Sequence, residues 1–234
     1  MGDEHHRAML EHFGRLPATR RFHDAAVVLE LLQSLELPPS PRILDLGCGN
    51  GLGTFDVARA FPHARVLGLD PSPGQIEAAR ANLRDLPLTN VELSTGYVDN
   101  LVDNFDLVVL LQVIQFFENP VQELRKLRSR VAEGGFLLLS TGVLPEGSPG
   151  REFARGLLER FIPHTRHWFS ESELRGVLGA AGFRVERVRP DPWRLREVNV
   201  ERQAILAEEL RRWGLGLEAV EPWMKAVYLL ARAV

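Results

Sequence analysis

The chain has 234 residues, of which 45% are hydrophobic, and its formal net charge is −3 at pH 7. This length and hydrophobic share suit one domain with a sizeable core, and the slight acidity argues against a nucleic-acid-binding protein. The one cysteine, Cys48, excludes an intrachain disulfide and a cysteine-built zinc site. Since no apolar run reaches the length of a membrane span, we expect a soluble protein of the reducing cytoplasm.

Two helices are predicted before the first strand. Apolar residues recur with helical spacing at 3–14 and again at about 20–36. Three prolines, Pro38, Pro39 and Pro41, end the second helix. We expect the second helix to pack on a sheet and the first to fold back over the mouth of a ligand site.

The stretch 42–54 predicts a buried strand that runs into a glycine-rich turn and then a helix. Its apolar run is bounded upstream by prolines, which is typical of a strand covered on both faces. Glycine in the turn permits positive φ and the close approach of a ligand, and the free N–H groups at the helix start would face that ligand. The glycines stand at every second position: Gly47, Gly49, Gly51 and Gly53.

The spacing of these glycines separates two ligand classes. The dinucleotide fingerprint G-x-G-x-x-G is absent, because the third glycine of the frame from Gly47 would fall on Leu52, and the frame from Gly49 also fails. Instead, Asp45 stands two residues before the first glycine. A carboxylate there would repel a pyrophosphate but suits a cationic ligand, such as one with an ammonium and a sulfonium group.

A second apolar strand, 65–70, ends in Asp70, about twenty residues after the glycines, where a carboxylate can accept both ribose hydroxyls. Together, 43–54 and 66–72 resemble motifs I and II of the class I S-adenosylmethionine-dependent methyltransferases, of the small-molecule, UbiE/MenG-like kind. The resemblance implies an α/β fold, a Rossmann-like doubly wound sheet of seven strands, mostly parallel with an antiparallel last strand, and helices on both faces. It implies S-adenosylmethionine as cofactor and S-adenosylhomocysteine as product.

The resemblance places the cofactor at the carboxyl ends of the strands. Tyr97 stands where the family usually has an acid that holds the adenine amino group. Either Asp99 takes this role, or Tyr97 and the Val98 amide frame the base, or Tyr97 simply packs at a strand end. The expected cofactor-binding residues are Asp45, Gly47, Cys48, Gly49, Asn50, Gly51, Asp70, Pro71, Gln75, Tyr97, Val98 and Gln112.

The rest of the chain continues the alternation of strands and helices. The family has an insertion that covers the substrate where this chain has a Pro- and Gly-rich loop and a helix, 142–169. We expect helices at 54–61, 72–83, 121–131, 151–161, 170–180 and 200–213, and strands at 90–94, 104–111, 136–140, 183–188 and 226–231. We divide the single domain into N-terminal helices over the mouth (1–40), a cofactor-binding core (41–141), the substrate cover (142–169) and C-terminal helices and strands (170–234).

A general base is needed only if the acceptor must lose a proton. Gln115 stands where the family often has a histidine, and a glutamine amide cannot usefully accept a proton. The candidate bases are His164 and His167 on the predicted cover, although histidines more often have a polar or capping role. His12 and His23 are weaker candidates. Arginines of the cover could hold an acidic substrate, with a solvated helix face as the commoner alternative: Arg151, Arg155, Arg160 and Arg166.

The predicted function is transfer of a methyl group to oxygen, nitrogen or carbon of a small, hydrophobic or aromatic acceptor by in-line displacement. One alternative is a binding or regulatory protein that keeps the cofactor pocket and has lost transfer; another, disfavoured by the glycine spacing, is an NAD-dependent oxidoreductase. Acids and amides between 99 and 106 have metal-ligand chemistry, but turn formation explains them better and no metal is expected. We expect no nucleic-acid or membrane partner, and a monomer or homodimer.

Overall fold

The structure is a computed structural model that describes residues 2–20 and 23–234. Within these ranges, eight strands form one sheet of order β3-β2-β1-β4-β5-β8-β7, and the short β6 pairs with β5. Strands β1 to β5 are parallel, whereas β8 is antiparallel to β5 and β7. The strands are β1 (Arg42–Leu46), β2 (Arg65–Asp70), β3 (Val91–Thr95), β4 (Phe105–Leu111), β5 (Val131–Leu144), β6 (Phe169–Ser170), β7 (Phe183–Pro192) and β8 (Lys225–Ala233).

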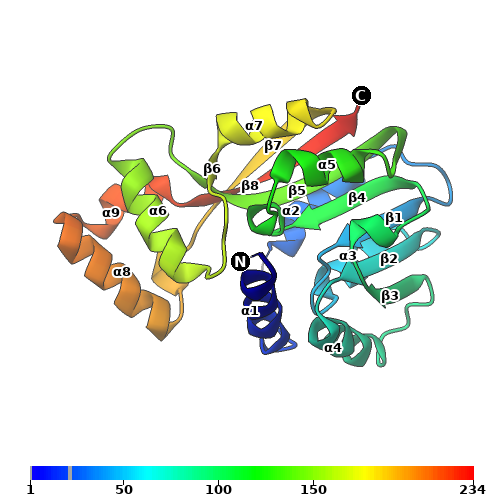
Figure 1. Cartoon of the computed structure of the whole chain (residues 1–234), viewed down its shortest axis with the longest axis horizontal. Helices are drawn as coiled ribbons and strands as arrows, with labels where there is room; N and C mark the ends of the chain where they lie inside the picture. The colour runs from blue at the N-terminus through cyan, green and yellow to red at the C-terminus, as the bar shows by residue number, and fades with distance from the viewer. Residues whose placement is uncertain (1, 21–22) are drawn as a thin grey trace.

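This arrangement confirms the predicted Rossmann-like sheet with helices on both faces, and β6 is an addition to the seven expected strands. The described α-helices lie on both sides of the sheet and beside it (Figure 1). They are α1 (Gly2–Gly14), α2 (Ala25–Gln33), α3 (Leu52–Ala60), α4 (Pro73–Leu83), α5 (Pro120–Arg128), α6 (Gly150–Phe161), α7 (Glu171–Ala180), α8 (Val200–Trp213) and α9 (Leu217–Val220).

Each central strand is buried on both faces, because its successive side chains point to opposite sides of the sheet. Leu44 of β1 belongs to the core under α5 and α7, which lie above the sheet in Figure 1. Its neighbour Ile43 belongs to the core under α2 and α3. The continuous apolar runs of β1 and β4 therefore reflect two cores, one on each face.

Several boundaries differ from the sequence prediction. The helix expected at 121–131 ends at Arg128, and β5 starts at Val131, so residues 132–135, which separate the expected helix from the expected strand 136–140, lie inside the strand. The register between β4 and β5 shifts at this point, and Gly134 has a φ of 68°. The strand is irregular here, and a glycine turn in the sequence cannot be distinguished from such an irregularity without the pairing partner. Strand β7 is longer than expected, because it pairs with β8 as far as Pro192.

The C-terminal helices form a separate cluster beside the sheet, which we call the C-terminal lobe (α6, α8 and α9; left in Figure 1). Phe153 and Leu157 of α6 pack with Leu206 of α8 and Val220 of α9 in a core of their own. No helix in the described part of the chain is both long and apolar enough to cross a membrane.

Candidate functional site

The glycine turn after β1 depends on glycine at particular positions. Gly47, Gly49 and Gly51 have φ angles of 73°, 53° and 82°, in the left-handed region that side chains disfavour. A Cβ on Gly47 would lie 2.4 Å from Cγ2 of Val113, so the turn also packs too tightly there for any side chain. The backbone N–H groups of Gly47 and Cys48 both donate to the carbonyl of Leu69, which ties the turn to β2.

Asp70 fixes the turn from the end of β2. Its Oδ2 accepts a hydrogen bond from the Gly49 amide (2.9 Å), and its Oδ1 accepts one from the Ser72 amide (2.8 Å). Burial raises the pKa of Asp70, and these two amides oppose that effect. Each carboxylate oxygen keeps acceptor capacity for a ligand.

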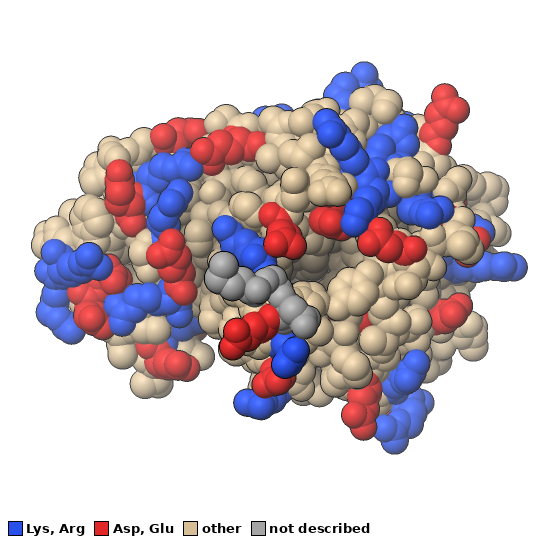
Figure 2. Space-filling view, viewed as in Figure 1, with Lys and Arg blue, Asp and Glu red and all other residues tan. Residues whose placement is uncertain are grey.

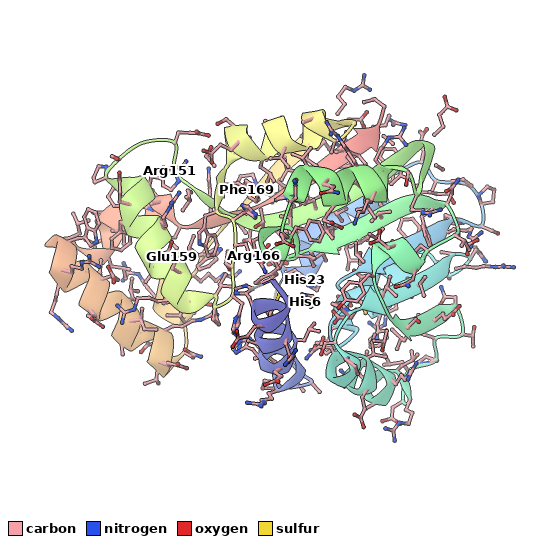
Figure 3. The ribbon with its side chains drawn as sticks, viewed as in Figure 1. His6, His23, Arg151, Glu159, Arg166 and Phe169 are labelled. Carbon is pink, nitrogen blue, oxygen red and sulfur yellow. The ribbon has the colours of Figure 1, made fainter. Side chains whose placement is uncertain are left out.

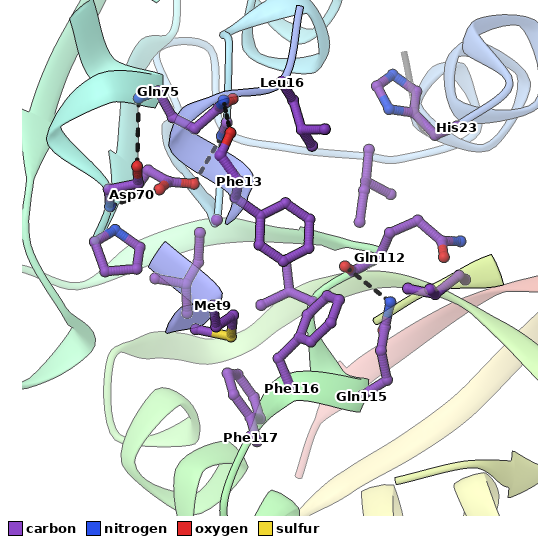
Figure 4. A pocket seen from close by; sticks show the side chains of 18 of the residues that line it. Met9, Phe13, Leu16, His23, Asp70, Gln75, Gln112, Gln115, Phe116 and Phe117 are labelled. Carbon is purple, nitrogen blue, oxygen red and sulfur yellow. Dashed lines mark hydrogen bonds between the residues drawn. The ribbon is translucent and has the colours of Figure 1, made fainter. Parts of the chain in front are cut away.

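A cavity of about 870 Å³ lies at the carboxyl ends of β1, β2 and β4, where the strand order of the sheet reverses. Its volume is within the range usual for small-molecule sites, and the face seen in Figure 2 is hollowed near its centre. Figure 4 shows Asp70 and Gln112 on opposite sides of the space. The predicted cofactor residues that line it are Gly47, Gly49, Asp70, Pro71, Gln75, Tyr97, Val98 and Gln112.

The other four predicted cofactor residues, Asp45, Cys48, Asn50 and Gly51, are not among the described residues that line the cavity. Cys48 is buried in the apolar cluster beneath α4. Asn50 donates from Nδ2 to the carbonyl of Arg20 (2.7 Å), and Gly51 is the N-cap of α3. These residues support the glycine turn from the side that faces away from the cavity.

Asp45 in particular corrects the sequence interpretation. Its side chain is buried, and Oδ2 accepts a hydrogen bond of 2.6 Å from Oγ1 of Thr54 in α3. Burial raises the pKa of Asp45 to about 6. The carboxylate therefore braces the turn against α3 and does not present a charge to the cavity.

The N-terminal segment closes one side of the cavity, and we call residues 4–20 the N-terminal cover. Gln75 donates from Nε2 to the carbonyl of Phe13 (2.5 Å), and Asn82 donates from Nδ2 to the carbonyl of Ala18 (2.9 Å). The ring of Phe13 meets that of Phe116 edge to face, with centroids 5.1 Å apart (Figure 4). The N-terminal cover thus lies over one side of the cavity, and Gln75 holds it in place.

The loop after β4 is braced by a second set of polar side chains. Gln112 has a φ of 60°, which is strained for a residue with a side chain, and its Nε2 donates to Oγ of Ser140 (3.3 Å). Gln115, only 1% exposed, donates from Nε2 to the Gln112 carbonyl (3.0 Å) and accepts from Oγ1 of Thr141 (3.2 Å). The glutamine at the family's histidine position therefore holds the loop, and Gln112 reaches the cavity.

The structure does not bring the two predicted bases to the cavity. His164 has a φ of 67° and lies against the ring of His12, and the ring of His167 lies 3.2 Å from the Glu118 carbonyl. The amides of Arg166 and His167 both donate to the Gln115 carbonyl, and this anchorage directs Arg166 to the cavity. The described histidines that line the cavity are His6, His12 and His23.

The end of the cavity beside the C-terminal lobe contains two aromatic residues of the kind expected for a hydrophobic or aromatic acceptor, and two residues, Arg202 and Tyr228, that the sequence interpretation missed. The rings of Phe161 and Trp193 are stacked, with centroids 6.3 Å apart and planes 2° apart. Tyr228 of β8 accepts a hydrogen bond from the Asp24 amide (2.7 Å), and Arg202 of α8 also lines this end. Because Arg202 and Tyr228 come from separate elements, no local spacing could have indicated them. Within the described ranges, no three His, Cys, Asp or Glu residues group as metal ligands.

Comparisons with known proteins identify the family. A family model described as a methyltransferase domain matches residues 44–137, which contain the glycine turn and Asp70. An uncharacterized 37.1 kDa protein in transposon TN4556 of Streptomyces fradiae is 31% identical over 68% of this chain and 48% of its own length. A ubiquinone biosynthesis O-methyltransferase of Azorhizobium caulinodans is 28% identical over 77% of this chain and 67% of its own length. This chain thus spans about half of the first relative and two thirds of the second.

Among solved structures, the YcgJ protein from Bacillus subtilis has the same fold. Its TM-score is 0.73 at 18% identity, over 89% of this chain and 98% of that protein. The fold and the sequence matches agree with the motif resemblance. The chain therefore belongs to the class I S-adenosylmethionine-dependent methyltransferases and is related to the members that act on small molecules.

Proposed function

We propose that this chain transfers the methyl group of S-adenosylmethionine to oxygen, nitrogen or carbon of a small-molecule acceptor. The observation that carries the proposal is the extent of one cavity. It begins at Gly47 and Asp70 and continues past Gln112 to Trp193 and Tyr228. A donor at the first end and an acceptor at the second would lie side by side, which is what a displacement in line requires.

The first end of the cavity fits the cofactor. Asp70 would hold the ribose, since its oxygens keep acceptor capacity beyond the two amide bonds that fix them. Val98 and Tyr97 would lie against the adenine, and the glycine turn against the methionine part, where any Cβ on Gly49 would narrow the site. When bound, the cofactor supplies a methyl group on a positively charged sulfur.

The chain itself would position the two reactants, exclude water from them and supply a proton acceptor. The N-terminal cover and Phe116 shield the cavity from solvent, and Gln112 stays fixed by its contact with Ser140. Burial and the neighbouring Arg20 lower the pKa of His12, which favours the neutral ring that can accept a proton. We infer that His12, which lines the cavity, takes the proton of an acceptor that must lose one.

Calorimetric titration with S-adenosylhomocysteine tests the cofactor half of the proposal. Asp70→Asn places an amide N–H against one of the two backbone amides and should weaken binding roughly tenfold or more. Asp85→Asn, on the exposed stretch after α4, is the matched control and should bind like the wild type. Equal affinity in all three proteins, or no binding by the wild type, would contradict the site.

A methyl-release assay with labelled S-adenosylmethionine and a panel of phenols, carboxylic acids and amines tests the transfer itself. We expect transfer to one class of acceptor. If that acceptor must lose a proton, the transfer rate should be lower in His12→Gln. Cofactor binding without transfer to any member of the panel would favour the alternative of a binding or regulatory protein.

A further inference from the structure

Two arginines in one part of the cavity, Arg166 and Arg202, differ from the other arginines of the cover and the C-terminal lobe. We call this part the acceptor end; it is lined by Phe161, Arg166, Asp191, Trp193, Arg202 and Tyr228. Arg151 forms a salt bridge with Glu173 at 2.8 Å, and Arg160 pairs with two glutamates of α8. By contrast, no carboxylate of the described residues lies within 4.0 Å of the guanidinium of Arg166 or Arg202. Figure 3 shows Arg166 near the centre of the molecule, whereas Arg151 lies farther out on α6.

Arg202 is held in place by an aromatic neighbour. Its Nη2 donates to the Phe161 carbonyl (3.0 Å), and its Cζ lies 5.2 Å from the centroid of the Phe161 ring. That ring stacks on Trp193, so a cation and two parallel rings form one layered surface. Desolvation and the adjacent Arg20 lower the pKa of Arg202, which means that its positive charge is incompletely compensated here.

Two carboxylates, Asp191 at the acceptor end and Asp24, also line the cavity. Asp24 caps α2, where its Oδ1 accepts hydrogen bonds from the amides of Ala26 and Val27. Burial and the neighbouring Asp24 raise the pKa of Asp191, which favours its uncharged form, while Arg194 and Arg189 oppose this effect. Asp24 is thus engaged in capping and Asp191 is disfavoured as an anion, whereas Arg166 and Arg202 keep guanidinium donors for a ligand.

We propose that the methyl acceptor carries a carboxylate beside an aromatic body, with Arg166 and Arg202 binding the carboxylate and the Phe161–Trp193 stack packing against the ring. This inference rests on the proposed function, because it names the acceptor class of the same cavity. Guanidinium groups suit the recognition, since they donate two parallel hydrogen bonds to a carboxylate. The paired rings offer a flat apolar surface beside it.

The test uses the full chain saturated with S-adenosylhomocysteine and two probes of the same shape, 2-naphthoate and its neutral amide, 2-naphthamide. Calorimetry should give roughly tenfold or tighter binding of the carboxylate over the amide. Arg202→Gln and Arg166→Gln should each reduce this preference, while Arg211→Gln, exposed on the same helix α8, should retain it.

The measurements also separate a structural effect from a recognition effect. Arg202→Gln removes the bond to the Phe161 carbonyl, so its melting temperature and its affinity for S-adenosylhomocysteine are measured alongside. Among the residues that the structure describes, Arg166 forms a hydrogen bond through its backbone amide and none through its side chain, so Arg166→Gln should leave the fold intact. Equal binding of the two probes, or a preference that survives both substitutions, would overturn the inference while the proposed function stands. Failure of the wild type to bind S-adenosylhomocysteine would instead remove the proposed function.

Discussion

One added methyl group at Gly47 should strongly disturb the glycine turn after β1. Its φ is +73°, and a Cβ there would lie 2.4 Å from Cγ2 and 3.2 Å from Cγ1 of Val113. Gly214, the C-cap of α8, provides the matched control, because its φ is +64° but a Cβ there would meet nothing within 4 Å. Both alanine variants carry the cost of a left-handed backbone, and only Gly47→Ala adds a steric overlap.

These two terms give the expected magnitudes. A left-handed conformation costs a non-glycine residue about 1–2 kcal/mol, so Gly214→Ala should lower the free energy of unfolding by about that amount. Overpacking adds about 1–3 kcal/mol, so Gly47→Ala should lower it by about 2–5 kcal/mol. Val113→Ala removes both atoms that overlap, and the double variant should recover about 1–3 kcal/mol relative to the sum of the single variants.

Urea denaturation followed by tryptophan fluorescence measures all four variants, and titration with S-adenosylhomocysteine reports the turn itself. Affinity should fall in Gly47→Ala and stay unchanged in Gly214→Ala, which is far from the turn in the fold. Equal destabilisation in the two glycine variants would refute the packing argument. Strictly additive effects of Gly47→Ala and Val113→Ala would refute the assignment of the overlap to Val113.

Two further predictions concern buried polar groups. Burial raises the pKa of Asp45 from its ordinary 3.8 to about 6, so its stabilising contribution is present below pH 4 and lost as the pH rises through 6. Relative to Asp45→Asn, the wild-type free energy of unfolding should therefore fall by on the order of 3 kcal/mol from pH 4 to pH 7, and a constant difference in denaturant titrations would contradict this. Tyr228→Phe leaves the Asp24 amide without its acceptor and should lower the free energy of unfolding, measured by urea denaturation, by about 1–3 kcal/mol. The same loss of stability in Tyr97→Phe, whose side chain is exposed, would show that the hydrogen bond to Asp24 is not the cause.

The family and the core of the fold were predictable because their signals are local. Positive φ at Gly47, Gly49 and Gly51 is a requirement of the backbone itself, and it leaves glycine at each position whatever the surroundings. The position of Asp70 was predictable because it ends the apolar run of β2, which places it at the carboxyl end of the strand. Strands that are buried on both faces of a parallel sheet are also recognisable from sequence, because they appear as continuous apolar runs.

The direction of side chains near the site was decided by tertiary contacts. Asp45 turns to Thr54 because α3 packs behind the turn, and nothing in the motif itself specifies that side. In the cover, the Gln115 carbonyl binds two successive amides and thereby presents Arg166 to the cavity in place of the neighbouring histidines. Arg202 joins it from α8 only through the packing of the lobe. Sequence alone thus determined the glycine turn, because its conformation is a requirement of the backbone. The acceptor end instead depends on elements that meet only when the whole chain is folded.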